Sequence, residues 1–380
     1  MKILALRGDG IGPEIVDATI KVLKTISQKF NFNLDLIYSE IGFSSLKKNK
    51  TTFPEEILKL CSEVDGIILG PVDHNNYPPK SEGGLNPSGE LRTKLKLYSN
   101  IRPAKAFKGI KCILDKIDLV IVRENTEGFY ADRNMFSGNG ELEIEEGTGI
   151  SIRKITKKAS ENIAKRGFEI AKLINKNKKV NVHAIHKANV LRLTDGIFLN
   201  ACRNISKKYP EINYHEMLVD AATAHMVRNP EQFDVLITTN MFGDILSDLA
   251  SELSGSLGLS GSLNVGDTIP MAQAQHGAAT DIVNKGIANP ISLIFSTAML
   301  LDWLGKQKGQ EIYIKANQLI YKVVENILEE NKYLTPDLGG NSSTEKLTDH
   351  IIERIENHEW FKIHTSIFNE RGNLKRISFS

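Results

Sequence analysis

The sequence has few features of exported, disulfide-bonded or membrane-spanning proteins. Its three cysteines, Cys61, Cys112 and Cys202, are far apart, odd in number and without CxxC spacing, so neither a disulfide framework nor a thiolate metal site is expected. Only four apolar residues, ILAL, lie between Lys2 and Arg7, too few for a signal-peptide core. The longest apolar run, 291–301, contains serine and threonine and is shorter than the roughly 20 residues of a membrane-spanning helix. We therefore expect a protein that is not exported and that is located in a reducing cytoplasm. The segment 291–301 is expected to be a helix in the core or at a subunit interface.

The sequence also lacks an excess of either charge. It has 48 Lys and Arg against 46 Asp and Glu, for a formal net charge of +2. The overall charge therefore does not indicate binding to nucleic acid or to a membrane surface, and a small molecule is the favoured ligand. At 380 residues the chain exceeds the length at which one core usually stops growing, which favours two domains, one of them interrupted by the other.

Short β-branched runs alternate with helical patterns along the chain. This order favours an α/β protein with an open, mostly parallel sheet and with its chemistry at the carboxyl ends of the strands. Strands are predicted at 3–7, 66–70, 118–125, 179–187 and 233–240.

Two irregular segments stand out between these elements. The segment 73–90 is rich in Pro, Gly, Ser and Asn, and loops of that length are usually functional. The segment 132–149 predicts a hairpin or arm. The motif RGDGIGPE (7–14) follows a strand and opens a helix, but its GxGxG spacing does not match the GxGxxG of a Rossmann fold. A tight structural turn and a ligand loop remain equally open there.

Three arginines lie near predicted strand ends: Arg92, Arg102 and Arg123. Guanidinium groups stay charged and can grip carboxylates in a bidentate manner, so the set suits a small polycarboxylate. Any one of these arginines, taken alone, is more simply interpreted as a solvated surface charge than as a ligand-binding residue. Tyr130, seven residues after Arg123 in RENTEGFY, offers a phenol that can move a proton.

A lysine and three aspartates form a second group of candidates. Lys187 closes an apolar strand, where it is either a general base or an ordinary strand-end lysine that reaches solvent. Asp244 and Asp248 are four residues apart on a predicted helix, so both carboxylates face one point. Together with Asp220 they could hold Mg²⁺ or Mn²⁺. Helix capping is a competing role for Asp244 but not for Asp248, one turn further on.

The segments GDGIGPE, LYSNIRPAK, VRENTEGFY, HKANV, NMFGDILSDLAS, HGAATDIVNKGIANP and TPDLGG together resemble the β-decarboxylating dehydrogenases. This family includes isocitrate, 3-isopropylmalate, homoisocitrate and tartrate dehydrogenases. The resemblance implies an isopropylmalate-dehydrogenase-like two-domain α/β fold that is not a Rossmann fold. It also implies a homodimer with shared active sites. By this resemblance, residues 1–98 and 254–370 together form a large cofactor-binding domain. Residues 99–253 form a small domain with a dimerisation arm, and residues 371–380 form a tail.

The resemblance also implies roles for individual residues. Arg92, Arg102 and Arg123 would hold the substrate's carboxylates, with Ser88 nearby. Tyr130 and Lys187 would be the proton-transfer pair. Asp220, Asp244 and Asp248 would hold Mg²⁺ or Mn²⁺, with Lys187 and Asp220 serving the partner's site. His276, Gly277, Asp281 and Asn289 would contact the adenosine half of the cofactor, with Asn189 near the nicotinamide.

The cofactor and the substrate can be argued from positions where relatives differ. Relatives that use NADP tend to carry lysine and tyrosine at the positions of Asp281 and Ile282, so NAD is expected here. Isopropylmalate enzymes present leucines at the positions of Ser88 and Gly89, which this chain lacks. An isocitrate-like substrate is therefore favoured, and 3-isopropylmalate, homoisocitrate, tartrate and malate remain open. Gln273 departs from the glutamate that the family more often carries near the nicotinamide ribose.

Two hypotheses without catalysis compete with the hypothesis of an enzyme. Regulatory subunits of NAD isocitrate dehydrogenase keep the fold but typically lose parts of the Tyr, Lys and Asp set, whereas this chain has all five of those residues. A nucleotide-binding interaction protein would leave the spacing of Asp244 and Asp248 unexplained. Catalysis is therefore the favoured reading.

Overall fold

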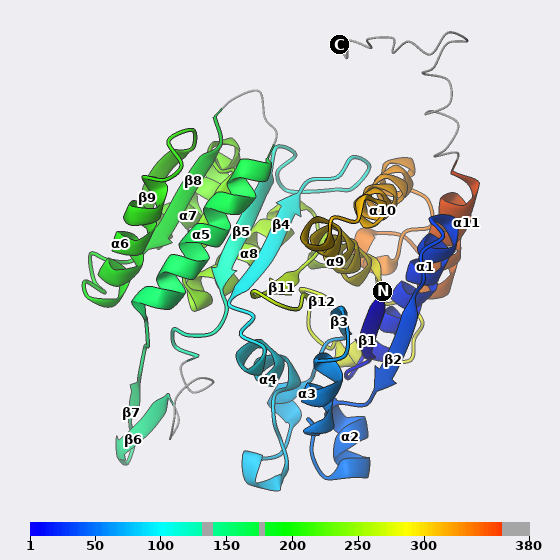
Figure 1. Ribbon diagram of the computed structural model, residues 1–380, viewed down its shortest axis with the longest axis horizontal. Coiled ribbons are helices and arrows are strands. Elements are labelled where there is room, and N and C mark those ends of the chain that lie inside the picture. Colours follow the sequence, from blue (N-terminus) through cyan, green and yellow to red (C-terminus); the bar gives the residue numbers. More distant parts are fainter. Residues whose placement is uncertain (131–139, 175–178, 359–380) are drawn as a thin grey trace.

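The computed structural model describes residues 1–130, 140–174 and 179–358. Within these residues, one sheet of ten strands runs through the molecule (Figure 1). Neighbouring strands are parallel towards both edges of the sheet and antiparallel only in its centre. This confirms the predicted α/β class with a mostly parallel sheet. The strand order is β2 (Asp35–Ser39), β1 (Lys2–Leu6), β3 (Gly66–Leu69), β12 (Met271–Gln273), β11 (Leu263–Val265), β4 (Ser99–Lys105), β5 (Asp118–Glu124), β10 (Val235–Thr238), β8 (Asn181–His186) and β9 (Asn213–Leu218).

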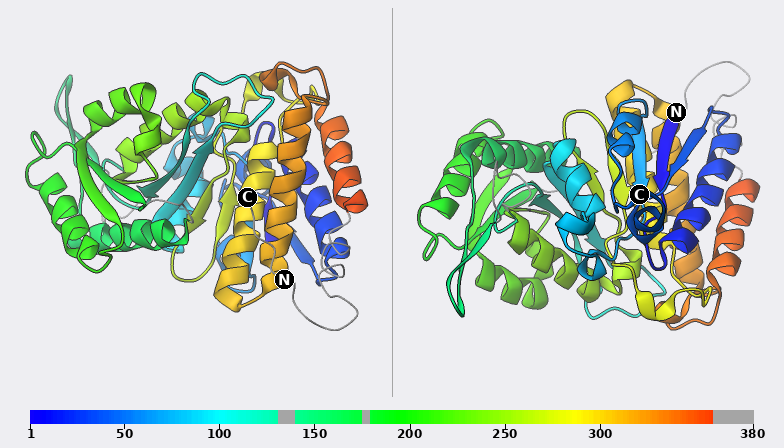
Figure 2. Two further views of the ribbon diagram at one scale, coloured as in Figure 1. Left: turned by 90° about the horizontal axis from the view of Figure 1, so that it is seen from above. Right: turned by 90° about the horizontal axis from the view of Figure 1, so that it is seen from below.

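Helices from both ends of the chain pack together beside β1 and β12. Helix α1 (Gly12–Lys29) lies against α11 (Thr344–Asn357) and α9 (Ile291–Lys308), and α9 lies against α10 (Glu311–Glu330). Figure 2 shows these four helices side by side. The first half of α9 is almost completely buried, so the apolar run at 291–301 is part of the core. Among the described residues, no helix is both long and apolar enough to cross a lipid bilayer.

The other half of the sheet is covered by helices on both faces. Helices α5 (Lys157–Leu173) and α6 (Thr194–Ser206) lie on one face. Helices α7 (Val219–Arg228) and α8 (Asn240–Ser254) lie on the opposite face. Strand β10 (Val235–Thr238) begins with three consecutive apolar residues, and their positions explain this run. Val235 and Ile237 join the core under α5, whereas Leu236 joins the core under α8, because successive side chains of a strand point to opposite faces.

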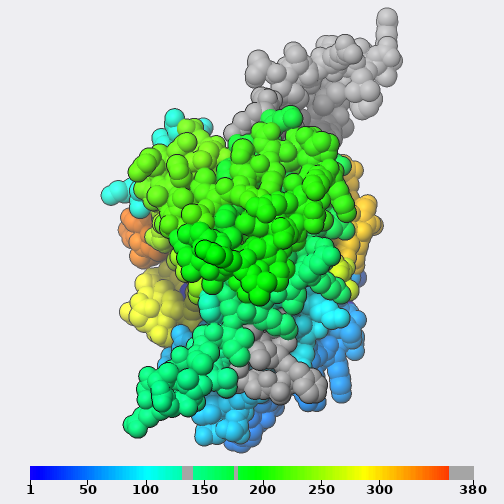
Figure 3. Space-filling model, turned by 90° about the vertical axis from the view of Figure 1, so that its left-hand side faces the viewer, coloured from blue at the N-terminus to red at the C-terminus, as the bar shows by residue number. Residues whose placement is uncertain are grey.

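Shorter elements complete the molecule near β3 and at its surface. These are α2 (Gly42–Asn49), α3 (Glu56–Cys61) and α4 (Pro87–Lys94), and the antiparallel pair β6 (Glu141–Glu145) and β7 (Thr148–Ser151). The β6–β7 hairpin projects away from the sheet (Figure 1) and stands out from the surface of the molecule (Figure 3). The predicted arm at 132–149 is thus a hairpin in its described part, and residues 131–139 lie outside the described residues.

All five predicted strands are present, as β1, β3, β5, β8 and β10. Two core clusters draw mainly on the first hundred residues and those after 258, and two others draw on residues between 104 and 253. On the basis of these clusters, we propose the division that the sequence predicted. Residues 1–98 and 254–370 form a large domain, and residues 99–253 form a small domain. The tail at 371–380 lies outside the described residues.

A buried carboxylate ties the end of β5 to the start of α5. Glu127 accepts hydrogen bonds from the Thr156 backbone N–H at 2.8 Å and from its hydroxyl at 2.9 Å. Thr156 is also the N-cap of α5. Burial, followed by the nearby charge of Glu124, raises the pKa of Glu127 to about 7. Because Glu127 lies between Arg123 and Tyr130 in the sequence, this contact fixes the segment that carries both residues.

The raised pKa of Glu127 predicts a specific dependence of stability on pH. Folded protein keeps this proton up to about pH 7, while the unfolded chain loses it near pH 4.5, so this group's contribution to stability falls as the pH rises between those values. Glu127→Gln should remove that loss, stabilising the protein at pH 8 relative to wild type by roughly 2–4 kcal/mol, with little gain at pH 5. Urea unfolding at both values, at fixed protein concentration, measures the difference.

The matched control is Glu161→Gln, which changes a partly exposed glutamate on α5 that pairs with Lys157 at 3.7 Å. It should alter stability by less than about 1 kcal/mol at both pH values. An equal effect of Glu127→Gln at pH 5 and pH 8 would show that the carboxyl does not titrate between them.

Candidate active site

The register of β4 and β5 brings two of the predicted arginines to one face of the sheet. Asn100 pairs with Arg123, and Arg102 pairs with Ile121. Because alternate residues of a strand share a face, Arg102 and Arg123 are diagonal neighbours on the same face. Both side chains are buried, with 6% and 2% exposed. Two cations in such a position need an anionic partner.

Helix α8 supplies that partner. Asp244 Oδ1 lies 3.1 Å from Arg102 NH1 and also forms an ion pair with Arg123 NH1. Arg102 NH1 lies 3.4 Å from Asp248 Oδ1. The helix begins at Asn240, with Thr239 at its N-cap, so Asp244 lies beyond the first turn. The capping role considered for Asp244 is therefore wrong, and both aspartates face the arginines as their spacing predicts.

Charges around Asp244 and Arg102 shift their protonation equilibria. Burial would raise the pKa of Asp244, but the guanidinium groups of Arg123, Arg102 and Arg92 outweigh it and hold that pKa below its ordinary value. Burial and the charge of Arg123 lower the pKa of Arg102 to about 10. At neutral pH the aspartate is therefore ionised and the arginine protonated.

These side chains open into a cavity of about 220 Å³. It lies where α4, the carboxyl end of β5, the start of α8 and the segment after β12 meet. The cavity brings together Ser88, Arg92, Arg102, Arg123, Tyr130, Asp244, His276 and Gly277, all of which the sequence predicted as site residues, with Asn86, Gln273 and Gln275 among its other lining residues.

Tyr130 lies on the carboxylate side of this cavity. Its hydroxyl donates to Asp244 Oδ2 at 3.3 Å, and the Arg123 guanidinium carbon lies 5.9 Å from the centre of its ring. The phenol therefore sits within hydrogen-bonding distance of the ion-paired aspartate, where a proton can be passed to or from a bound ligand.

Lys187 and Asp220 lie together but apart from this cavity. Lys187 Nζ is 2.7 Å from Asp220 Oδ1, and this hydrogen bond lowers the pKa of Asp220. The Lys187 backbone N–H donates to the buried Asp195 carboxylate, which forms an ion pair with Arg153 at 2.6 Å. In the described part of this chain, no group of three His, Cys, Asp or Glu side chains is arranged to hold a metal. The three-aspartate metal site stays a prediction that requires a second subunit.

The predicted cofactor residues fall into two regions. His276 and Gly277 line the cavity. Burial lowers the pKa of His276, although the carboxylate of Asp337 opposes this shift. Asn289 Nδ2 donates to Asp337 Oδ2 at 2.9 Å, which joins the TPDLGG loop to the same region. Asp281 is exposed in a short 3₁₀ turn (Thr280–Ile282), and Asn189 is exposed just after β8, beside Lys187.

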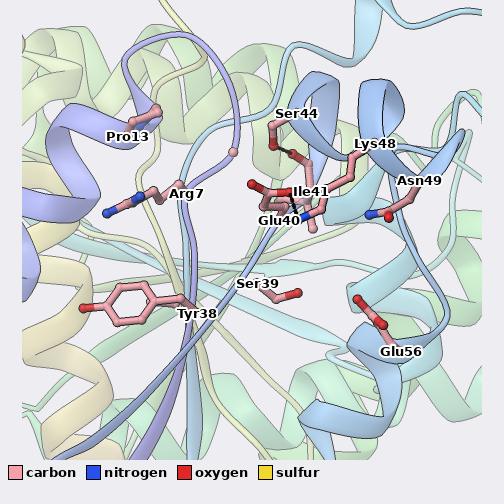
Figure 4. A pocket seen from close by; sticks show the side chains of 12 residues that line it. Arg7, Pro13, Tyr38, Ser39, Glu40, Ile41, Ser44, Lys48, Asn49 and Glu56 are labelled. Carbon is pink, nitrogen blue, oxygen red and sulfur yellow. Dashed lines mark hydrogen bonds and ion pairs between the residues drawn. The ribbon is translucent and has the colours of Figure 1, made fainter.

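A larger cavity of about 590 Å³ lies elsewhere, at the carboxyl ends of β1 and β2. Figure 4 shows Glu40 and Lys48 side by side in it, joined by an ion pair of 3.3 Å. Arg7, also on its wall, pairs with Asp17 at 2.9 Å. Since the cations of this cavity are already matched by exposed acids, it lacks the excess positive charge of the arginine cavity.

Several functional contacts are not evident from the sequence motifs. Asn240 Oδ1 accepts from Arg123, Ser247 Oγ accepts from Arg102, and Gln275 Nε2 donates to Asp248. The α8 residues could have been found from helical periodicity, because positions 240, 244, 247 and 251 share one face. Nothing in the sequence around Gln273 and Gln275 indicates their partners, which lie far away along the chain.

Comparison with known proteins gives consistent results. A family model described as isocitrate/isopropylmalate dehydrogenase matches residues 2–355. The chain is 38% identical to a 3-isopropylmalate dehydrogenase from Sulfurisphaera tokodaii, covering 92% of this chain and 98% of the relative. It is 40% identical to a homoisocitrate dehydrogenase from Methanocaldococcus jannaschii, covering 93% and 98%. The crystal structure of isocitrate dehydrogenase from Methylococcus capsulatus matches with a TM-score of 0.83 and 36% identity, covering 94% and 99%.

Gly243 is a structural requirement of this site. A Cβ atom there would lie 2.6 Å from Arg123 Cγ and 2.9 Å from Thr238 Cγ2. Gly243→Ala should therefore displace Arg123 and weaken citrate binding, used as a polycarboxylate probe, by about 10-fold or more, while overpacking lowers stability by about 1–3 kcal/mol. Isothermal titration and thermal unfolding measure the two effects.

Gly196 provides the matched control. It lies in the first turn of α6, and a Cβ atom added there meets nothing within 4 Å. Gly196→Ala should leave citrate affinity unchanged and raise stability by up to about 1 kcal/mol. Citrate binding by Gly243→Ala at the wild-type affinity would refute the steric argument.

Proposed function

The chain belongs to the isocitrate/isopropylmalate dehydrogenase family, and we propose that its substrate is isocitrate-like. Members of this family are β-decarboxylating dehydrogenases that use NAD(P) and a divalent metal. The chain is therefore an oxidative decarboxylating dehydrogenase that acts on a small hydroxy acid. The observation that carries the proposed substrate is the polar wall of the cavity, where Ser88 and Arg92 of α4 are buried side by side.

The polarity of the cavity favours a substrate with more than two carboxylates. Two carboxylates on adjacent carbons are common to all substrates of the family, so the third substituent decides between them. Here the wall formed by α4 offers Asn86 and Ser88 beside Arg92, and Gln273 faces them. An apolar substituent such as an isopropyl group would leave the buried Ser88 and Arg92 without a ligand partner, which is unfavourable.

Tyr130 and Lys187 are proposed to move protons during the reaction. Lys187 of a partner subunit would take the proton of the substrate's C2 hydroxyl, and Tyr130 would protonate the carbon that loses the carboxylate. NAD would accept the hydride. Arg102 and Arg123 hold the carboxylates in place throughout, because their guanidinium groups are fixed by α8.

The residues on α8 fit a divalent cation by their chemistry. Asp244 and Asp248 present hard oxygen donors one helical turn apart, and their side chains are 35% and 52% exposed. Mg²⁺ or Mn²⁺ usually takes few carboxylates and completes its shell with substrate and water. When bound, the cation would supply Lewis acidity for loss of CO₂. We propose that Asp220 of a partner subunit is the third carboxylate.

The residues near His276 fit the adenosine half of NAD. His276 Nε2 is a buried atom with no hydrogen-bond partner among the described residues. Its lowered pKa keeps the ring neutral, which suits contact with an uncharged base. Asp281 is exposed nearby in sequence, where a carboxylate would disfavour the additional phosphate of NADP. We therefore propose NAD as the cofactor, with Asn289 and Gly277 in the adenosine site and Asn189 near the nicotinamide.

A homodimer is supported by apolar side chains at the surface near Lys187 and on α8. Val190, Leu193 and Ile245 are 67%, 78% and 59% exposed. Leu142 and Ile144 of the β6–β7 hairpin are also more than half exposed. We propose that these side chains form part of the interface with a second copy of the chain. The cysteines Cys61, Cys112 and Cys202 are free thiols, which supports the proposed location in a reducing cytoplasm.

The proposed function is tested by turnover of a panel of hydroxy acids. With NAD and Mg²⁺ or Mn²⁺, isocitrate should give a higher kcat/KM than 3-isopropylmalate, homoisocitrate, malate or tartrate, followed by NADH formation. Asp244→Asn should reduce turnover by about 100-fold or more, because a neutral amide is a poor ligand for the cation. Asp302→Asn, which alters an exposed ion pair with Lys306 on α9, is the matched control and should not change turnover.

No turnover of any acid with NAD or NADP would refute the catalytic proposal. A higher kcat/KM for 3-isopropylmalate would refute the isocitrate-like substrate alone.

Shared active sites predict recovery of activity in mixed dimers. Lys187→Ala and Asp244→Asn homodimers should each be inactive. In a mixed dimer, one site receives Asp244 from the Lys187→Ala subunit and Lys187 from the Asp244→Asn subunit, so it is fully wild type. Random reassembly of equal amounts should therefore restore about a quarter of wild-type activity. Assays before and after joint unfolding and refolding measure it, with each variant refolded alone as the control, and absence of recovery would contradict the shared site.

A further inference from the structure

Gln273 occupies a central position beneath the substrate cavity. It is the last residue of β12, and its side chain is 9% exposed. Its Oε1 atom accepts hydrogen bonds from Arg92 NH2 at 3.0 Å and from Ser88 Oγ at 3.1 Å. Both donors belong to α4, which forms the wall where substrates of this family differ. One amide oxygen therefore holds two donors that line the cavity.

The orientation of this amide follows from its partners. A guanidinium group only donates hydrogen bonds, so the atom next to Arg92 must be the oxygen and not the nitrogen of Gln273. Ser88 must then donate its single hydroxyl proton to the same oxygen. Since a hydroxyl can rotate about its C–O bond, the Ser88 proton can leave Gln273 and turn towards a ligand.

The backbone of Gln273 is fixed from both sides. Its N–H donates to the Ser262 carbonyl at 3.1 Å, and its own carbonyl accepts from the Ser296 hydroxyl at 3.0 Å. Asn264, which is completely buried, donates to the Met271 carbonyl at 3.3 Å and lies 3.5 Å from Gln273 Oε1. The acceptor oxygen is thus held in place before any ligand arrives, as preorganised sites require.

The neutrality of the amide matters as much as its position. A carboxylate at 273 would form an ion pair with Arg92 and a charge-assisted hydrogen bond with Ser88, so it would hold both donors more strongly than the neutral amide does. It would also repel the carboxylates of the substrate. A neutral acceptor orients both donors and lets them turn to an anionic ligand.

We propose that Gln273 is a positioning residue that sets specificity for an anionic third substituent through Ser88 and Arg92. This inference rests on the proposed function, since it concerns how the same cavity selects its hydroxy acid.

Two substitutions separate the two properties of the amide. Gln273→Glu keeps the acceptor but adds a charge, and Gln273→Met keeps neutrality and similar size but removes the acceptor. Gln273→Glu should raise the KM for isocitrate by about 10- to 100-fold and Gln273→Met by about 3- to 10-fold, with the KM for NAD changed by less than about 3-fold. In both variants the ratio of kcat/KM for isocitrate to that for malate, which lacks the third substituent, should fall.

The matched control is Gln307→Glu, which places the same charge change at an exposed glutamine that donates to the Thr268 carbonyl. It should leave both KM values unchanged. A Gln273→Glu enzyme with an unchanged KM for isocitrate and a lower KM for NAD would overturn the inference, because Gln273 would then serve the cofactor.

A binding measurement separates this inference from the proposed function. Citrate carries three carboxylates but has a tertiary hydroxyl that cannot be oxidised, so it reports binding without turnover. Citrate should raise the thermal unfolding midpoint of the wild type, and this shift should be at least halved in Gln273→Glu but not in Gln307→Glu. If the wild type turns over no acid and the citrate shift still depends on Gln273, the catalytic proposal fails and the role of Gln273 stands. If the shift is equal in all three proteins, the inference is overturned even where isocitrate is turned over.

Discussion

The compensation of buried arginine charge by α8 is the constraint on which the rest of the site depends. Arg102 and Arg123 are almost completely buried on one face of β4 and β5. Isolated charges cannot be buried at that depth, so a carboxylate must approach the sheet from outside. Asp244 does so, and the absence of a side chain at Gly243 allows α8 to come close enough. The helix that packs against β4 and β5 therefore also places the proposed metal ligands.

The topology of the sheet explains why residues so distant along the chain share one cavity. Strands β11 and β12 return from the C-terminal half of the chain and insert between β3 and β4. This insertion places Gln273 beside α4, 181 residues away from Arg92 in the sequence. It also makes the centre of the sheet antiparallel, and the short strands β11 and β12 bring Gln273 close to Arg102 of β4 across the sheet.

The sequence predicts the long, strongly apolar elements well and the short or polar ones poorly. Strands such as β10 are buried on both faces, so apolar residues follow one another in their sequences without alternation. Strands β11 and β12 have three residues each, too few to show any period. The spacing of Asp244 and Asp248 correctly predicted a shared face, because it depends only on helix geometry. The partners of Gln273 depend on contacts across the fold, and the proposed use of Lys187 and Asp220 depends on another subunit, so neither follows from local pattern.

Charge balance links the proposed substrate to the proposed cation. Among the described residues lining the cavity, three arginines are opposed by one carboxylate, that of Asp244, so the cavity carries an excess of positive charge. Asp244 Oδ1 is engaged by two guanidinium groups, and a cation that approached it alone would meet their repulsion. Substrate carboxylates that bind the arginines reduce that repulsion, and a cation bound at Asp244 in turn reduces the repulsion among the substrate's own carboxylates. A tricarboxylate and a divalent cation therefore favour each other's binding, and by thermodynamic linkage each must raise the affinity for the other by the same factor.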